Sequence, residues 1–546
     1  MGSKRLFVYS GLMMAALLLW QAWQEEHSPA AINHQTVVEQ GVSTTSAIPL
    51  PEDMGTEPAS TVVKTPATKS AGSVRVVTDT LEVRLGLLGG NVNEVKLNDF
   101  TLSLQDKTLE TVLSDHPKSI RSSQSGLEGA MGPDNAKSGQ AIYTAEKTQY
   151  SLAPGQDKLM VNLKWHSHDG VKITKHLLFK RGSYAIQTSY TVNNTSPKAW
   201  KGRIYLQLKS REQEGNGMFG MRTYAGNAIS SPETKYEKLS FSDLKKQNLD
   251  RDIRGGWLAS QEHYFIAAWV PEKDQLFHYY SFVSPEDDYV VGLVGNRFAL
   301  EPGQKITTPV SSLYAGPEEA HRLEALAPGS LKLTIDYGRF WVISAPIFWV
   351  LQKLHQAIGN WGWAIIAITM LMKMLFYRLS EKSYRSMAKM RLLQPKLESI
   401  KSRCGDDKAK MSQETMALYQ KEKVNPLGGC LPMVVQIPIF LALYWVLIES
   451  VELRQAPFIF WIHDLSVKDP FYVLPILMGV SMFFQQHLNP KPQDPMQAKV
   501  MMFLPVMMTG LFVSFPAGLV LYWLSNNVLS ILQQWMIMKR VNAGEA

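Results

Sequence analysis

The stretch WGWAIIAITMLMKMLFYRL, residues 361–379, decides the fold class of this chain. It is about as long as an apolar helix that crosses a bilayer, and it carries a cation deep within it, Lys373. At about 1.5 Å of rise per residue, Lys373 lies roughly 9 Å from the predicted cytoplasmic end, where a charge costs on the order of 3 kcal/mol. Either the lysine stem snorkels to the headgroups, or the ammonium serves a function inside the membrane.

The chain divides into a soluble part and a membrane part. Of its 546 residues, those from 24 to about 335 carry regular charges, whereas apolar runs of bilayer length alternate with short polar segments from 340 to 538. Cys404 and Cys430 are the only cysteines, and neither lies in the soluble part, so no disulfide framework supports it. The composition predicts an α+β membrane protein with a large soluble domain.

Residues 1–23 form the first predicted span. Lys4 and Arg5 precede its apolar run and acidic residues follow it, so its N-terminus is expected in the cytoplasm. The bulky sequence near Trp23 lacks a small-x-small cleavage site, which favours an uncleaved anchor over a signal peptide. Residues 24–72 are rich in Pro, Ser, Thr and Ala and are predicted to be a flexible linker.

Residues 73–335 are predicted to form a mostly β sandwich on the outer side of the membrane. Short alternating segments are separated by turn residues such as Gly89-Gly90-Asn91. The clearest predicted strands are residues 74–78, 81–87, 92–97, 159–166, 171–180 and 185–192. His166 and His168 could offer two imidazoles to a metal, but a lone H-x-H without a third ligand is more often a polar strand surface, so no metal or cofactor is expected.

The rest of the chain reads as membrane helices and a cytoplasmic loop. In chain order we predict an interfacial amphipathic helix at 340–360, a second span at 361–379, a cytoplasmic hairpin at 380–425, spans at 430–448, 471–488, 500–515 and 519–538, and a short cytoplasmic tail at 539–546. Pro505 is expected to break the short fifth span. With the N-terminal anchor this gives six spans and two cytoplasmic termini, because bases exceed acids in the predicted inner segments.

The cytoplasmic loop is strongly basic. Between Arg378 and Lys423 there are 12 Lys or Arg residues and 6 Asp or Glu residues. Apolar residues at helical spacing predict one helix up to Cys404, kinked or divided by Pro395, and Asp406 or Asp407 is expected to cap a second helix. The candidate docking residues are Lys382, Arg385, Lys389, Arg391, Lys396, Lys401 and Arg403. They form either a solvated positive-inside loop or a docking surface for ribosomal RNA or anionic lipid.

Several polar residues are predicted to share the depth of Lys373. Gln436 is as far from the inner end of its span as Lys373 is from the end of its own, and Thr369 lies one turn away on the same face. The last span places further polar and aromatic side chains near the midplane: Tyr522, Trp523, Ser525, Asn526 and Asn527. Each could simply join helices, but together they indicate a concavity open to the cytoplasm.

The sequence also weighs against other function classes. The spans contain no internal Asp or Glu and no inverted repeat, which argues against an ion-coupled transporter or a channel. The chain has no G-x-x-x-x-G-K-[ST] loop and no G-x-S-x-G elbow, so nucleotide hydrolysis and esterase chemistry have no visible carrier. A membrane-anchored periplasmic carbohydrate-binding protein would not need five further spans.

Three motifs carry a family resemblance: NPLGGCLPMVVQIPIF at 425–440, VELRQAPF at 451–458 and WIHDL at 461–465. With them, essentially the whole chain resembles the Oxa/YidC/Alb family of membrane protein insertases in its Gram-negative long form. The resemblance implies a five-helix core around a hydrophilic groove that is open to cytoplasm and lipid, and a periplasmic β-supersandwich. It further implies an inner-membrane location, an ATP-independent insertase and chaperone rather than an enzyme, and no small-molecule substrate. Nascent membrane proteins, the Sec translocon, the ribosome and lipids are the implied partners.

The chain departs from the family pattern in the groove. The family's groove cation is usually arginine, and the alignment through the following SMAKM motif places Lys373 there. Lysine lacks the planar guanidinium fork, so a requirement for bidentate contact is in doubt, whereas attraction by charge is retained. Arg378 stands where the family often has proline, and the short tail after Lys539 weakens a role of the tail in ribosome binding.

Overall fold

The computed structural model describes residues 72–117, 119–129, 131–135, 139–212, 223–338, 340–405, 407–422, 424, 431–489 and 495–543. The predicted N-terminal anchor and linker lie outside these residues. The chain forms two compact units, one built of β strands and one of helices.

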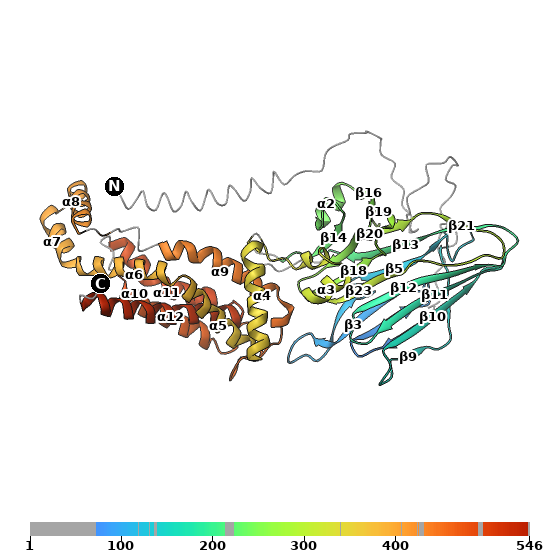
Figure 1. Ribbon diagram of the computed structural model, residues 1–546, viewed down its shortest axis with the longest axis horizontal. Coiled ribbons are helices and arrows are strands. Elements are labelled where there is room, and N and C mark those ends of the chain that lie inside the picture. The colour runs from blue at the N-terminus through green and yellow to red at the C-terminus, as the bar shows by residue number, and fades with distance from the viewer. Residues whose placement is uncertain are drawn as a thin grey trace. The chain divides into compact units, whose positions relative to one another are not determined.

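The β unit consists of two β sheets, each with one main path of neighbouring strands (Figure 1). The first sheet has the order β16 (Asp250–Arg254), β19 (Leu276–Val283), β20 (Asp288–Gly295), β13 (Trp200–Arg211), β5 (Arg121–Glu128), β3 (Val92–Thr101), β2 (Leu81–Gly86), β1 (Ser73–Val77) and β9 (Gln149–Ser151), with β4 (Leu109–Leu113), β6 (Asp134–Asn135), β7 (Gly139–Gln140) and β21 (Phe298–Leu300) at its sides. The second has the order β15 (Glu237–Leu239), β14 (Gly226–Ser230), β17 (Trp257–Gln261), β18 (Phe265–Val270), β23 (Ser311–Pro317), β12 (Ala185–Asn194), β11 (Val171–Lys180), β10 (Lys158–His166) and β8 (Thr144–Ala145), with β22 (Lys305–Thr307) beside β12. Short helices α2 (Phe241–Lys246), α3 (Ala320–Leu326) and η1 (Leu331–Thr334) complete the unit.

The alternation in the sequence explains the strands. Along β11 every second residue is buried, from Val171 to Phe179, so one face of the strand joins the core. The six strands predicted from the alternating pattern are confirmed within a few residues at each end. Gly89 and Gly90 form the predicted turn with positive φ angles of 69° and 60°, which glycine adopts without a steric cost. β10 ends at His166, so His168 lies beyond the strand.

A lysine lies inside the sandwich core and joins the two sheets. Lys175 of β11 is fully buried, and its Nζ donates hydrogen bonds to the carbonyl oxygen of Gly90 at 2.7 Å and to Ser125 O and Oγ at 2.8 and 2.9 Å. Burial lowers the pKa of Lys175, and the nearby carboxylate of Asp134 opposes that shift. These acceptors replace the water that the ammonium loses on folding.

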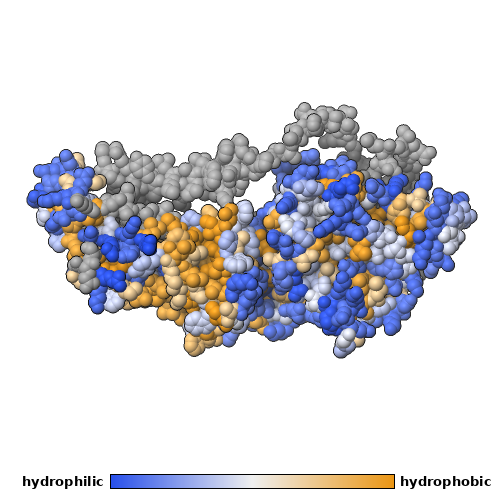
Figure 2. Space-filling view, viewed as in Figure 1, coloured by the Kyte–Doolittle hydropathy of each residue, from blue (hydrophilic) through white to orange (hydrophobic). Residues whose placement is uncertain are grey.

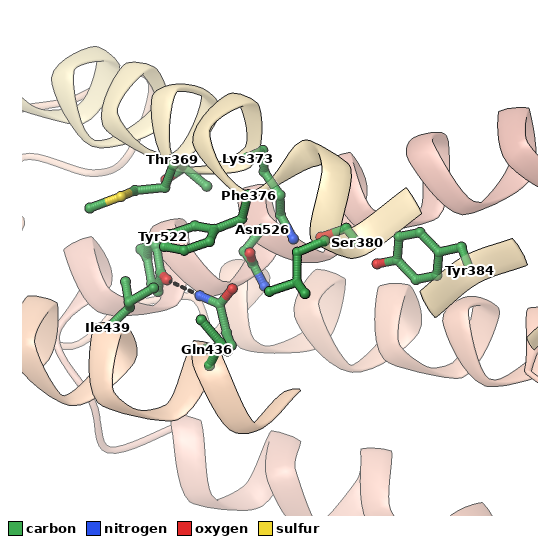
Figure 3. A pocket seen from close by; sticks show the side chains of 12 residues that line it. Thr369, Lys373, Phe376, Ser380, Tyr384, Gln436, Ile439, Tyr522 and Asn526 are labelled. Atoms are coloured by element: carbon green, nitrogen blue, oxygen red, sulfur yellow. Dashed lines mark hydrogen bonds between the residues drawn. The ribbon is translucent and has the colours of Figure 1, made fainter. Parts of the chain in front are cut away.

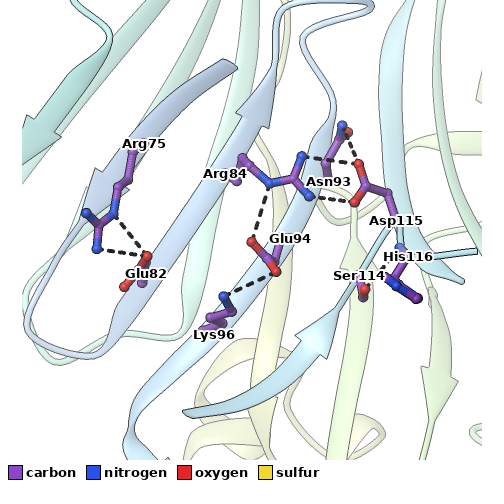
Figure 4. A network of polar contacts seen from close by, with 9 residues as sticks. All are labelled: Arg75, Glu82, Arg84, Asn93, Glu94, Lys96, Ser114, Asp115 and His116. Carbon is purple, nitrogen blue, oxygen red and sulfur yellow. Dashed lines mark hydrogen bonds and ion pairs between the residues drawn. The ribbon is translucent and has the colours of Figure 1, made fainter. Parts of the chain in front are cut away.

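The outer face of β1, β2 and β3 carries charge pairs across neighbouring strands (Figure 4). Arg75 pairs with Glu82 at 2.9 Å, and Arg84 pairs with Glu94 at 3.3 Å and with Asp115 at 2.5 Å. Such partly exposed pairs contribute between about 0 and 1 kcal/mol each. They keep this face soluble, whereas the buried aromatic and aliphatic side chains stabilise the fold.

The helical unit contains α4 (Trp341–Ile358), α5 (Trp361–Leu375), α6 (Tyr377–Leu392), α7 (Gln394–Cys404), α8 (Lys408–Lys421), α9 (Leu431–Glu449), α10 (Val473–Leu488), α11 (Pro495–Phe512) and α12 (Ala517–Asn542), with the short η3 (Val451–Leu453) after α9. α12 packs against α5, α6 and α10 (Figure 1). Hydrophobic side chains gather on the surface over α9–α12, and hydrophilic ones over α7 and α8 (Figure 2).

Several predicted helix boundaries were wrong. The predicted second span ends at Leu375 rather than residue 379, because the chain bends by 70° between α5 and α6. Within the described residues, no single helix meets the length and hydropathy expected of a membrane span, and only the bent pair α5 and α6 meets them together. In contrast, Pro395 does divide the hairpin arm, since α6 ends at Leu392 and Pro395 lies in the first turn of α7.

The prediction that Pro505 breaks its span was also wrong. α11 continues through Pro505 from Pro495 to Phe512. Proline has no N–H to donate to the carbonyl four residues earlier, which belongs to Met501. The side-chain Nε2 of Gln486, on α10, donates to that carbonyl instead at 2.5 Å. A neighbouring helix therefore supplies the missing donor.

Candidate functional site

Lys373 lies in the last turn of α5, one turn before the bend at Phe376. It is half-buried, and its Nζ donates a hydrogen bond of 2.7 Å to Oγ of Ser530 on α12. In the part of the chain that the structure describes, no carboxylate lies within salt-bridge distance of this ammonium. Among the described residues, the cation is thus held by a neutral hydroxyl rather than by a carboxylate.

Gln436 and Tyr522 join α9 to α12 beside the lysine. Nε2 of Gln436 donates to Oη of Tyr522 at 2.7 Å (Figure 3). Tyr522 is buried, and its ring stacks near Phe440, which in turn makes an edge contact with Trp523 at 4.6 Å between centroids. This polar pair therefore lies next to an aromatic wall.

The side chains surround a hollow of about 280 Å³ and a smaller one of about 40 Å³ beside it. Figure 3 shows Lys373, Asn526 and Gln436 converging on the smaller hollow from three helices. Both polar and apolar side chains line the larger hollow. Its polar residues are Lys373, Tyr384, Gln436, Gln485, Gln486, Asn489, Tyr522, Asn526, Asn527, Ser530 and Gln534, and its apolar and aromatic residues are Met387, Ile437, Phe440, Met482, Met501, Leu504 and Trp523.

The structure brings most of the predicted groove residues together. Lys373, Gln436, Tyr522 and Asn526 line both hollows, Thr369 lines the smaller and Trp523 the larger. Thr369 is buried and its hydroxyl donates to the carbonyl of Ile365 on its own helix, at 2.7 Å. Ser525 was the exception, since it lines neither hollow and its hydroxyl donates to Leu521 O at 2.7 Å.

Sequence reasoning missed part of the polar wall. The missed residues are Ser380, Tyr384, Gln485, Gln486, Asn489, Ser530 and Gln534. Asn526, Ser530 and Gln534 follow one another at intervals of four, so they share one face of α12, and this spacing was a signal available in the sequence. Tyr384 could not be found in this way, because it belongs to the predicted cytoplasmic loop.

The predicted docking residues of the hairpin divide into bases with and without an ion pair. Arg385 pairs with Glu381 at 2.7 Å, Lys396 with Glu422 at 2.6 Å and Arg403 with Glu414 at 2.9 Å. The last two pairs join α7 to the region of α8. The remaining bases are exposed and make no ion pair among the described residues: Lys382, Lys389, Arg391 and Lys401.

Comparison with known proteins covers both units. Residues 73–350 match the family described as YidC periplasmic domain, and residues 353–544 match the family described as 60Kd inner membrane protein. The membrane protein insertase YidC of Coxiella burnetii (strain RSA 331 / Henzerling II) is 45% identical over 560 residues, which cover 100% of this chain and 98% of the relative. The membrane protein insertase YidC of Legionella pneumophila (strain Corby) is 44% identical over 546 residues, covering 99% of this chain and 97% of the relative.

One solved structure is similar over most of the chain. It is an active YidC insertase crystal structure with its first transmembrane domain resolved, 16% identical, covering 85% of this chain and 92% of that one at a TM-score of 0.39. A galactose mutarotase related enzyme from Lactobacillus acidophilus is 11% identical and covers 44% of this chain and 97% of its own, at a TM-score of 0.32. At these scores neither likeness bears on the function.

Proposed function

This chain belongs to the YidC family of membrane protein insertases, and from that membership we propose that a client segment enters the hollow beside Lys373. The protein inserts other proteins into a membrane and is not an enzyme. It is a membrane protein with a periplasmic domain.

The observation that carries the proposal is a cation held between helices with no carboxylate partner among the described residues. An acidic or polar flank of a client would find in Lys373 a charge that is already partly desolvated. Two opposite charges 4 Å apart attract by about 4 kcal/mol at an effective dielectric constant near 20. This is comparable to the cost, on the order of 3 kcal/mol, of bringing one charge into the membrane.

The polar and the apolar lining residues of the hollow suit the two parts of such a client. The amides and hydroxyls of Gln436, Asn526 and Tyr522 would accept a polar flank, and Phe440 with Trp523 would contact the hydrophobic segment that follows it. Binding both parts lowers the barrier to moving the flank outward, because the polar flank keeps hydrogen-bond partners at half depth. No nucleotide is required for this step.

We further propose the topology that the sequence predicts. The N-terminal anchor, α5 with the bent start of α6, α9, α10, α11 and α12 would form six spans with both termini in the cytoplasm of a bacterial inner membrane. Short apolar helices suit a locally thinned bilayer or the shelter of neighbouring helices. α4 would lie at the outer interface, since Trp341 and Trp349 expose 63% and 61% of their surface. The β unit would be the periplasmic supersandwich.

The exposed bases of the hairpin support a role in receiving the nascent chain. Lys382, Lys389, Arg391 and Lys401 carry no ion pair within the described residues, so they are available to RNA phosphates or lipid headgroups. We propose the ribosome, anionic lipid and the Sec translocon as partners, and no small-molecule substrate. Attraction of this kind weakens as salt concentration rises.

A depletion-and-rescue assay tests the groove. Cells depleted of the parent protein receive Lys373→Arg, Lys373→Gln or Lys373→Glu, and insertion of a short client with an acidic outer region is measured by protease accessibility. We expect Arg to support insertion, Gln to reduce it and Glu to reduce it most. If Gln and Glu insert the client as well as the parent does, electrostatic attraction at Lys373 is refuted.

The control is a matched client in which the acidic residues are replaced by their amides. Its insertion should depend much less on the charge at position 373. Membrane levels of all variants are compared by immunoblot, so that a folding defect is distinguished from a loss of attraction.

A further inference from the structure

Ser530 is a buried hydroxyl at the meeting point of three helices. It lies on α12 with 3% of its surface exposed. It accepts the hydrogen bond from Lys373 of α5 at 2.7 Å, and it lines the larger hollow together with Tyr384 of α6. No other described hydroxyl or amide forms a hydrogen bond to the Lys373 ammonium.

The hydrogen bonds around Ser530 fix the direction in which its hydroxyl proton points. Its hydroxyl donates to the carbonyl oxygen of Asn526, one turn earlier, at 2.7 Å. A serine hydroxyl has one proton and two lone pairs, and a lysine ammonium has only protons to give. With its proton committed to Asn526, Ser530 presents a lone pair to the ammonium.

The contact opposes snorkelling. Lys373 stands one turn before the α5–α6 bend, and its flexible stem could otherwise carry the ammonium toward the cytoplasmic side. A hydrogen bond to the α12 helix holds the charge within the hollow, beside Asn526 and Gln436. The packing of α6 on α12 through Tyr384, Ala388, Ile537 and Val541 holds the third helix in place around the same point.

We propose that Ser530 is the positioning residue of the groove. Its hydroxyl keeps the Lys373 ammonium inside the hollow until an acidic or polar client flank takes the place of Ser530 as the partner of the ammonium. The inference rests on the proposed function of Lys373. Ser530 does not need to touch the client itself. It acts by setting where the charge is when the client arrives.

The test compares Ser530→Ala and Ser530→Thr, each in the parent and in Lys373→Gln. Threonine keeps the hydroxyl, whereas alanine removes it with little change in volume. Insertion is measured for the acidic client and for its amide counterpart. We expect Ser530→Ala to lower insertion of the acidic client about threefold, the factor that corresponds to an average interhelical hydrogen bond of about 0.6 kcal/mol. Ser530→Thr should restore insertion.

Three results would overturn the proposal. An equal loss for both clients would mean that Ser530 only supports packing, and an added loss from Ser530→Ala in the Lys373→Gln protein would mean that it acts independently of the lysine. An unchanged insertion in Ser530→Ala would overturn it as well. These outcomes differ from failure of the proposed function, which is shown by Lys373→Gln inserting the acidic client normally.

A second measurement does not depend on activity. A water-soluble amine reagent is applied to the full-length protein in inverted membrane vesicles, and modification of Lys373 is followed by mass spectrometry of its peptide. Ser530→Ala should raise the modification rate, and Ser530→Thr should leave it near the parent value. Equal rates in all three proteins would show that Ser530 does not hold the ammonium.

Discussion

Glu318 lies directly after β23 in the core of the β unit, and its replacement by glutamine tests how burial controls the stability of that unit. The side chain is 4% exposed, and one carboxylate oxygen accepts a hydrogen bond of 3.1 Å from Nε2 of Gln261. Burial raises the pKa of Glu318 from 4.5 to about 8. The folded unit therefore holds a proton that the unfolded chain releases near pH 4.5.

The sign of the pH dependence follows from this shift. Because the folded pKa lies above the unfolded one, the stabilising contribution is complete below pH 4.5 and is lost as the pH rises toward 8. Between pH 5 and 8 the free energy of unfolding falls by at most about 4 kcal/mol, since each pH unit corresponds to about 1.4 kcal/mol. For a unit of this size that is a fall in Tm of roughly 10 °C.

Glu318→Gln should remove most of this pH dependence of stability, because the amide that replaces the carboxyl group is neutral at every pH tested. The amide oxygen can still accept the hydrogen bond from Gln261. Calorimetric unfolding of the full-length protein in detergent, at several values between about pH 5 and 8, measures the effect. The variant should match the parent near pH 5 and exceed its Tm near pH 8. Glu272→Gln, at an exposed turn, is the matched control and should follow the parent. Parallel curves for the parent and Glu318→Gln would refute the reasoning.

Three further predictions concern other parts of the chain. Gly362→Ala places a Cβ against the ring of Phe458, so it should lower the thermal stability and the membrane level of the protein. Gly510→Ala, inside α11, meets open space and should lower neither, as fluorescence-detected thermal unfolding can show. Asp407→Ala removes the carboxylate that accepts hydrogen bonds at the start of α8 and should weaken the helix by about 1 kcal/mol; faster amide exchange in α8 would show it, and unchanged protection would contradict it. Lys175→Met leaves the buried acceptors of the sandwich core unpaired and should destabilise the β unit by about 3 kcal/mol in urea unfolding, so an unchanged midpoint would refute the importance of that contact.

Local sequence patterns predicted the elements of the fold well. Alternation with a period of two located β10, β11 and β12, because side chains of a strand point to opposite faces. Pro395 predicted the division of the hairpin arm, and the pair Asp406 and Asp407 predicted the start of α8, where Asp407 is the cap, since these residues act on the nearby backbone. Charge and apolar spacing also predicted that Lys373, Gln436 and Asn526 meet.

The boundaries that failed depend on partners far away in the chain. Pro505 should end a helix by its local chemistry, but Gln486 donates to the carbonyl that the proline leaves free. The sequence at the bend after α5 contains no proline or glycine, so it gives no local signal that predicts the bend. Ser525 and Ser530 look alike in sequence. Among the described residues, however, Ser525 forms a side-chain hydrogen bond only within its own helix, whereas Ser530 accepts one from Lys373.

The sequence by itself determined the family, the alternation of the strands and the presence of a cation within an apolar stretch. Only the tertiary structure decided what surrounds that cation, because Lys373 and Ser530 lie 157 residues apart and meet through the packing of α5 on α12. An ammonium in an apolar segment needs hydrogen-bond acceptors. The sequence shows that polar residues are present in the other helices, but it does not show which of them accepts from Lys373. The acceptor is the hydroxyl of Ser530, because it donates its own proton to the preceding turn of α12 and so turns a lone pair to Lys373.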